Sequence, residues 1–326
     1  MATSLSWDWS LTAADIIKSA WEDMNIIVAG GTVASADSTM ALTRLNMLTK
    51  QLQGVADGFP GMKIHTRQRI TLALAKGQQT YLVGPATTDA RASTAMGRTT
   101  ISAAEALGQT TISITSNTDT TSYPGTTITM TNGDFIGIEL DDGTIQWTTI
   151  SGTPGATATI AVALTAAAAA GNYVWWFTAR AQRFPVIESA VLRNSSLNDT
   201  PLDIYTEVEQ YELGVGDKYA DGTPTCILVE PLRLNTRIIC NSQPTDVTDQ
   251  IVLTVLYPSE DYDATTNDIA YPQEALLFLS WSLAKICAPA KSVVWTPLME
   301  SNYTFARSNY MNLNPENSVL YFQSAT

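Results

Sequence analysis

The sequence is poor in the residues from which most catalytic and metal sites are built. It holds three cysteines and a single histidine in 326 residues. Cys226, Cys240 and Cys287 are odd in number, widely spaced and outside any CxxC pair, which predicts free, buried thiols in a reducing compartment. A standard zinc site cannot be built from them, and a Ser–His–Asp or Cys–His site would have to use His65. We therefore expect a non-enzymatic protein without metal, cofactor or catalytic residues.

Basic charge is also scarce. The chain carries 18 lysines and arginines against 31 acidic residues, a formal net charge of −13. Between residues 99 and 179 there is no lysine or arginine at all. Tight DNA binding requires a basic surface, because the release of counterions supplies most of the affinity. The acidic balance argues against a protein that grips DNA and permits one past which DNA slides.

Long apolar runs are missing as well. None approaches the roughly 18–20 residues that cross a bilayer, and residues 1–9 lack the basic start and apolar stretch of a signal peptide. We therefore expect synthesis in the cytosol and no membrane partner. With 45% hydrophobic and 15% charged residues, a chain of this length can bury the core of one large domain or of two ordinary ones.

Helices are expected near both ends. Thr12 with Asp15 forms a capping signal, and the apolar residues that follow, up to Met24, share one helix face. Asp37 or Ser38 can cap a second helix, which has a leucine stripe over 42–52. Near the other end, 272–288 is apolar almost all round and predicts a buried helix, and 297–313 predicts a helix with one apolar face.

Strands are expected between these helices. The pattern over 69–83 predicts a hairpin that turns at Lys76-Gly77. Short β-type runs then recur, punctuated by turn dipeptides such as Asn132-Gly133 and Asp142-Gly143, and they lie at 111–115, 126–130, 135–140, 144–150, 157–164 and 173–178. Many short strands at this spacing predict a small sandwich or barrel. Further strands are expected at 224–230, 232–240 and 250–257.

The predicted fold class is α+β. A helical bundle from the N- and C-terminal helices is joined to a β portion, and an all-β sandwich or barrel is inserted into it. The expected divisions are 1–85 for the N-terminal helices and hairpin, 86–180 for the inserted β domain, 181–313 for the remainder of the host domain, and 314–326 for a C-terminal tail.

Two constellations have a functional and a structural interpretation. Glu207, Glu209 and Glu212 bunch together like the paired acids of a glycosidase, but alternation with apolar residues favours a solvated face. The tryptophans at 147, 175 and 176 could stack on sugars, but large aromatic residues of a small β domain more often form its core.

The chain resembles the family of podovirus head-to-tail adaptors, also called packaged-DNA stabilisation or head-completion proteins. The stretches that carry the resemblance are ADIIKSA at 14–20 with ALTRLNML at 41–48, GQQTYLVG at 77–84, LYP at 256–258 and YPQEAL at 271–276 with its continuation to Pro289. Each motif alone reflects mainly the spacing of core residues, and the order of the motifs along the chain is the stronger evidence for the resemblance. The insert looks like β modules of long members of such phage families, and the shortest members lack it.

The resemblance implies a ring, usually of twelve subunits, that docks beneath the portal protein, extends the DNA channel and presents a platform for the tail. It places the protein in the virion at the head–tail junction, after assembly in the bacterial cytoplasm. By analogy, a cluster in the C-terminal tail would contact the portal, namely Val319, Leu320, Tyr321 and Phe322. The alternative is that this tail folds back on its own domain.

Two rival functions stay open. The chain could be a receptor- or glycan-binding tail protein that uses the β insert, or a cell-wall hydrolase that uses the acids at 207–212.

Overall fold

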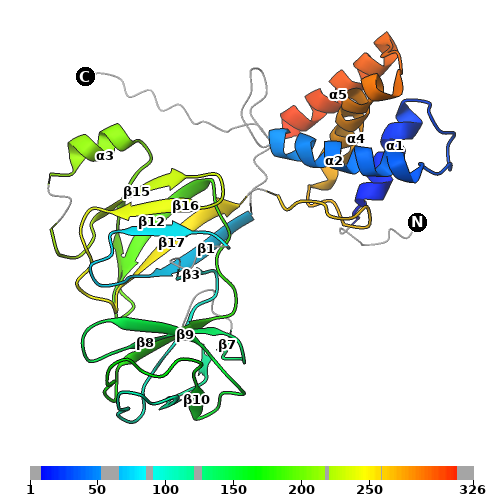
Figure 1. Ribbon diagram of the computed structural model, residues 1–326. Helices are drawn as coiled ribbons and strands as arrows, with labels where there is room; N and C mark the ends of the chain where they lie inside the picture. Colours follow the sequence, from blue (N-terminus) through cyan, green and yellow to red (C-terminus); the bar gives the residue numbers. More distant parts are fainter. Residues whose placement is uncertain are drawn as a thin grey trace, which may run out of the picture. The chain divides into compact units, whose positions relative to one another are not determined.

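The computed structural model describes residues 9–52, 66–85, 91–120, 127–216, 220–257 and 259–313. The chain divides into two compact units, a helical unit formed by Met1–His65 with Pro258–Thr326 and a β unit formed by Thr66–Tyr257 (Figure 1). The helices together with several, mainly antiparallel sheets confirm the mixed α+β class. None of the described helices is long and apolar enough to cross a membrane.

The helical unit is organised around one buried helix. Its elements are α1 (Ala13–Asp23), α2 (Ser35–Leu52), α4 (Gln273–Cys287), the 3-10 turn η1 (Ala288–Lys291) and α5 (Pro297–Leu313). Helix α4 contacts α1, α2 and α5, which explains why its sequence is apolar on nearly every side. Leu277 and Ile286 are exceptions, since both side chains are exposed.

The predicted start of α1 is confirmed, and that of α2 is shifted. Thr12 and Asp15 form a reciprocal capping box, in which the Thr12 backbone N–H donates to Asp15 Oδ2 at 3.0 Å. Helix α2 begins at Ser35, ahead of the expected caps. The carboxylate of Asp37 is instead paired with Lys291 of η1, so a tertiary contact has taken the place of the cap.

The upper part of the β unit is a sandwich of two sheets. The five-stranded sheet has the order β13 (Asp199–Pro201), β12 (Val186–Arg193), β17 (Gln250–Tyr257), β1 (Thr66–Ala73), β3 (Ala92–Ser93). The four-stranded sheet has the order β14 (Asp203–Tyr205), β15 (Cys226–Pro231), β16 (Thr236–Cys240), β2 (Thr80–Val83). Side chains of both sheets share one hydrophobic core, in which Leu72 and Leu253 meet Tyr81 and Ile238.

The predicted hairpin over 69–83 is wrong. Strand β1 pairs with β17 and β3, whereas β2 pairs with β16, so the two strands lie in different sheets. Both sequences suit strands. Each strand buries its apolar face by pairing with a strand that is distant in the sequence, and this choice of partner is not visible in the local pattern. Residues 66–85 consequently belong to the β unit and not with the N-terminal helices.

Residues 97–177 form a second β region with its own core. Its main sheet has the order β4 (Gly97–Thr100), β11 (Tyr173–Phe177), β8 (Phe135–Glu139), β9 (Ile145–Thr149). Two smaller sheets pair β10 (Thr157–Thr159) with β5 (Thr111–Ser113) and β6 (Thr118–Asp119) with β7 (Ile128–Thr129). Each predicted run therefore contains a strand, and the described strands form three separate sheets.

Two glycines of the main sheet allow indole rings to lie flat across the backbone. In the strand register, Gly97 of β4 is opposite Trp176 and Gly137 of β8 is opposite Trp147. A Cβ atom at Gly137 would lie 2.7 Å from the Trp147 ring, and one at Gly97 would come closer than 3.0 Å to the Trp176 ring. The missing Cβ atoms are therefore required for this packing.

Candidate functional site

The predicted portal contacts Val319, Leu320, Tyr321 and Phe322 lie outside the described residues, and so does His65. Among the described residues no group of three or more His, Cys, Asp or Glu side chains could hold a metal ion. The three cysteines are free and buried. Burial raises the pKa of each thiol, to about 12 for Cys240, which suits a packing role.

The acidic cluster lies on the surface. Glu209 and Glu212 belong to the short helix α3 (Val208–Gly214), and Glu207 precedes it. All three are exposed, whereas Tyr211 is buried and donates a hydrogen bond from its hydroxyl to the Cys240 carbonyl oxygen at 3.2 Å. The alternation with apolar residues favours a solvated face, and the three acids do face solvent on or beside a short helix of about two turns that Tyr211 anchors.

Of the three tryptophans singled out in the sequence, two are core residues and one borders a pocket. Successive residues of a strand face opposite sides, so Trp176 packs in the core of the second β region and Trp175 on the other face of the same sheet. Both are buried, as expected of core residues. Trp147 is partly exposed and lies on the same face as Trp175, where it borders a pocket.

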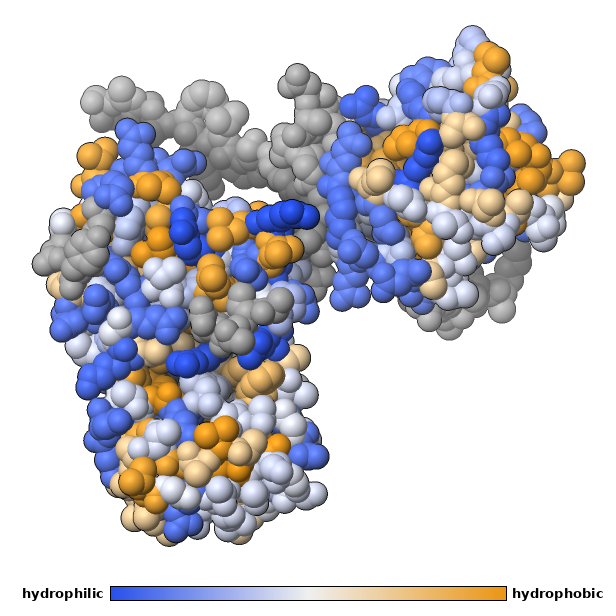
Figure 2. All heavy atoms as spheres, viewed as in Figure 1, coloured by the Kyte–Doolittle hydropathy of each residue, from blue (hydrophilic) through white to orange (hydrophobic). Residues whose placement is uncertain are grey.

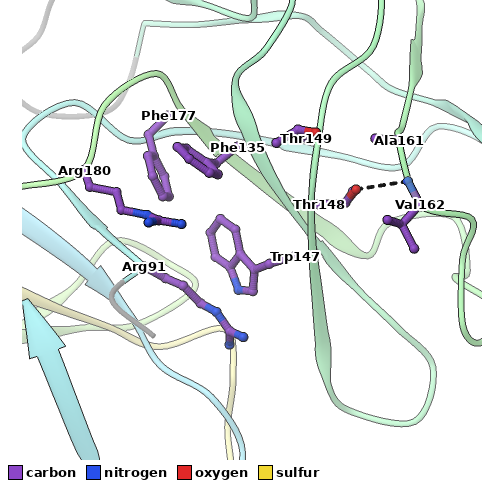
Figure 3. A pocket seen from close by; sticks show the side chains of 9 residues that line it. All are labelled: Arg91, Phe135, Trp147, Thr148, Thr149, Ala161, Val162, Phe177 and Arg180. Carbon is purple, nitrogen blue, oxygen red and sulfur yellow. Dashed lines mark hydrogen bonds between the residues drawn. The ribbon is translucent and has the colours of Figure 1, made fainter. Parts of the chain in front are cut away.

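This pocket has a volume of about 400 Å³ and an aromatic wall (Figure 3). The ring centroids of Phe135 and Phe177 are 5.2 Å apart, and those of Trp147 and Phe177 are 5.6 Å apart. Strand pairing explains the cluster, because Phe177 of β11 is opposite Phe135 of β8 and Trp147 of β9 lies across Gly137. The remaining wall is formed by Thr148, Thr149, Ala161 and Val162.

Two arginines lie against these rings. The Arg180 guanidinium carbon is 4.5 Å from the Phe135 ring centroid, and that of Arg91 is 5.6 Å from the Trp147 centroid. Figure 3 shows Arg180 extending toward the aromatic group and Arg91 running along the side of Trp147. Among the described residues that line it there is no Asp or Glu, so this part of the lining is basic on a chain with a net charge of −13.

Two hydrogen-bond donors of the pocket lining are buried. Trp147 Nε1 and Arg180 Nε are both buried without a hydrogen-bond partner among the described residues. A buried donor without a partner costs roughly 1–3 kcal/mol. The sequence pattern indicates Trp147 as a candidate but neither arginine. For Arg180 the available signal is its position, since the stretch without basic residues ends immediately before it.

The helical unit has exposed apolar side chains on α5. On α5, the Leu298 and Phe305 side chains are 71% and 63% exposed, and a spacing of seven residues places them on one helix face. Figure 2 shows apolar side chains at the surface of this unit. An adjacent face of α5 supplies Met299, Ala306 and Tyr310 to the core.

Comparisons of the chain with protein families, with curated proteins and with solved structures returned no match.

Proposed function

We propose that this chain is a structural head-to-tail adaptor of a tailed bacteriophage. In this proposal, about twelve copies form a ring beneath the portal protein, extend the DNA channel, retain the packaged DNA and offer a platform to a downstream tail protein. The helical bundle forms the ring wall, and the region over 86–180 is an inserted β domain. The protein acts in the virion, without catalysis.

The exposed apolar face of α5 is the observation that supports this proposal best. Leu298 and Phe305 stay in water in the isolated chain although the helix has a second face that is well buried. An apolar surface of this kind is typical of a protein contact. A neighbouring copy of the chain is the occupant that a closed ring requires, because each subunit of a ring presents two different side surfaces.

The acidic composition is compatible with a channel. A net charge of −13 would weaken the attraction between the ring and passing DNA, whose affinity for proteins depends on basic contacts.

The deciding experiment is the native mass of the purified chain, alone and after mixing with its cognate portal ring. We expect a monomer that converts to a large complex of fixed stoichiometry. A folded chain that stays monomeric beside a competent portal would contradict the proposal.

Substitutions on α5 sharpen this test. Leu298→Ser combined with Phe305→Ser should leave a folded monomer that no longer enters the complex, because the apolar contact is lost. Leu213→Ser on α3 is the matched control, since its side chain is 83% exposed but belongs to the β unit. Loss of assembly in the control and not in the α5 variant would contradict the assignment of this face.

A shortened chain tests the portal contact. Removal of residues 316–326 should leave a folded subunit that does not attach to the portal ring. Unchanged attachment would eliminate the portal-contact hypothesis for Val319, Leu320, Tyr321 and Phe322.

The aromatic pocket favours a second candidate function. A receptor- or glycan-binding tail protein would use Trp147, Phe135 and Phe177 as a stacking surface. Binding of host-surface glycans by the full chain, together with no assembly on the portal, would favour this candidate over the adaptor.

A further inference from the structure

We propose that the pocket bordered by Trp147, Arg91 and Arg180 binds a carboxylate-bearing sugar, such as a uronic acid unit of a surface polysaccharide. This inference rests on the second candidate function and names its ligand class. It does not depend on ring assembly, because every residue that carries it belongs to the β unit.

The charge of the pocket favours an anionic ligand. The ionisable side chains that line it, among the described residues, are Arg91 and Arg180, and a guanidinium can donate two parallel hydrogen bonds to one carboxylate. The unpartnered Arg180 Nε and Trp147 Nε1 are donors as well. A ligand rich in acceptors would therefore supply what the described residues around these atoms do not.

The aromatic wall favours a ring with an apolar face. Phe135 and Trp147 are only partly buried, so each keeps ring surface within reach of a ligand. Aromatic side chains that combine such surface with a polar group suit amphipathic ligands. A volume of about 400 Å³ lies within the range of small-molecule sites and accommodates one or two sugar rings.

A sugar is favoured over a nucleic acid by the surrounding sequence. Nucleic acid binding needs a basic track along successive phosphates. Residues 99–179 contain no lysine or arginine, so Arg180 directly follows, and Arg91 precedes, a region without such a track. A sugar with a single carboxylate needs only a small number of basic side chains, which the two arginines of the pocket provide.

Binding requires a side-chain movement. Both unpartnered nitrogens are buried, and the Arg91 guanidinium lies against the indole of Trp147. Rotation of Arg91 toward the ligand carboxylate would uncover the indole, which is a rotamer change of the kind that accompanies many binding events.

The test is isothermal titration of the full chain with a glucuronic acid-containing trisaccharide, a glucose trisaccharide and adenosine monophosphate. We expect the acidic trisaccharide to bind at least tenfold more tightly than the other two. Equal affinities, no binding of the acidic trisaccharide by a folded chain, or tighter binding of the nucleotide would overturn the proposal.

Variants locate the site. Arg180→Met should weaken binding of the acidic trisaccharide at least tenfold, and Arg91→Met is the second variant should the first fail to fold. Arg233→Met is the matched control, because Arg233 is exposed and lies outside the pocket. Retained affinity in both pocket variants would overturn the assignment. Portal assembly measured on the same variants separates this result from the fate of the adaptor proposal, since we expect assembly to be unchanged.

Discussion

Substitution of Gly97 by alanine tests the packing of the second β region. The added Cβ would come closer than 3.0 Å to the indole of Trp176, which has no exposed surface. On the neighbouring strand, the residue opposite Trp176 is the equally buried Ile136, so the ring has little room to move. Overpacking of a dense core costs typically 1–3 kcal/mol, and a rigid ring favours the upper part of that range, about 2–3 kcal/mol.

The assay is thermal and urea unfolding of the full chain, followed by tryptophan fluorescence and calorimetry. For a β unit of this size, each kcal/mol lowers the melting temperature by about 2–4 °C, so we expect a decrease of about 4–12 °C. The transition of the helical unit should be unaffected, because Gly97 belongs to the other unit.

Substitutions at two further glycines distinguish steric overlap from backbone strain as the cause of destabilisation. At Gly155 a Cβ would meet no atom of the described residues within 4 Å, so Gly155→Ala should change the free energy of unfolding by less than about 0.5 kcal/mol. At Gly133 the space is equally open but φ is +90°, so Gly133→Ala measures backbone strain alone, roughly 1–2 kcal/mol. The reasoning is refuted if Gly97→Ala unfolds like Gly155→Ala.

Three further results are expected. Thr12→Ala removes the side-chain cap of α1 and should lower the free energy of unfolding by about 1 kcal/mol in urea titrations, whereas an unchanged midpoint would show that the cap is dispensable. The three thiols should stay unreactive toward a thiol reagent at pH 8 until the chain is unfolded, because burial raises their pKa values, to about 12 for Cys240; rapid labelling of the folded chain would contradict this. Hydrogen bonds from Lys285 and then Trp295 lower the pKa of Glu300 below its ordinary 4.5, so this stabilisation is present above about pH 4.5 and is lost as the pH falls through the folded-state pKa. Glu300→Gln should therefore reduce the loss of stability between pH 6 and pH 3.5, and an identical pH profile would argue against the pair.

Local sequence patterns determined two kinds of element. In the first kind the interacting residues are close in the sequence, and in the second the pattern of apolar residues is compatible with only one structural environment. Thr12 and Asp15 are three residues apart, so the capping box of α1 follows from the sequence. The apolar run of α4 has no polar face, and such a helix can only be stable when it is surrounded. The turn dipeptides of 97–177 likewise marked the ends of short strands, and Gly133 and Gly143 adopt the positive φ that favours glycine.

Partner choice was decided by the tertiary structure. Strands β1 and β2 are adjacent in sequence, yet β1 gains an eight-residue antiparallel ladder with β17. Strand β12 pairs with the other edge of β17 and was missed by the sequence pattern, because most of its side chains are exposed or half-buried and show no clean alternation.

The pocket also depends on contacts between segments that are distant in the sequence. Trp147 could be identified as a candidate, but Arg91 and Arg180 are far from it in the sequence and carry no motif. They meet because β9, β8 and β11 pair in a register that sets Trp147, Phe135 and Phe177 on one face of the sheet. The amino-acid sequence by itself determined the cap of α1, the buried helix and the strand runs, since these depend on local backbone preferences and on the periodicity of apolar residues. Only the tertiary structure decided the strand partners and the basic aromatic pocket, because both depend on contacts between segments that are distant in the chain.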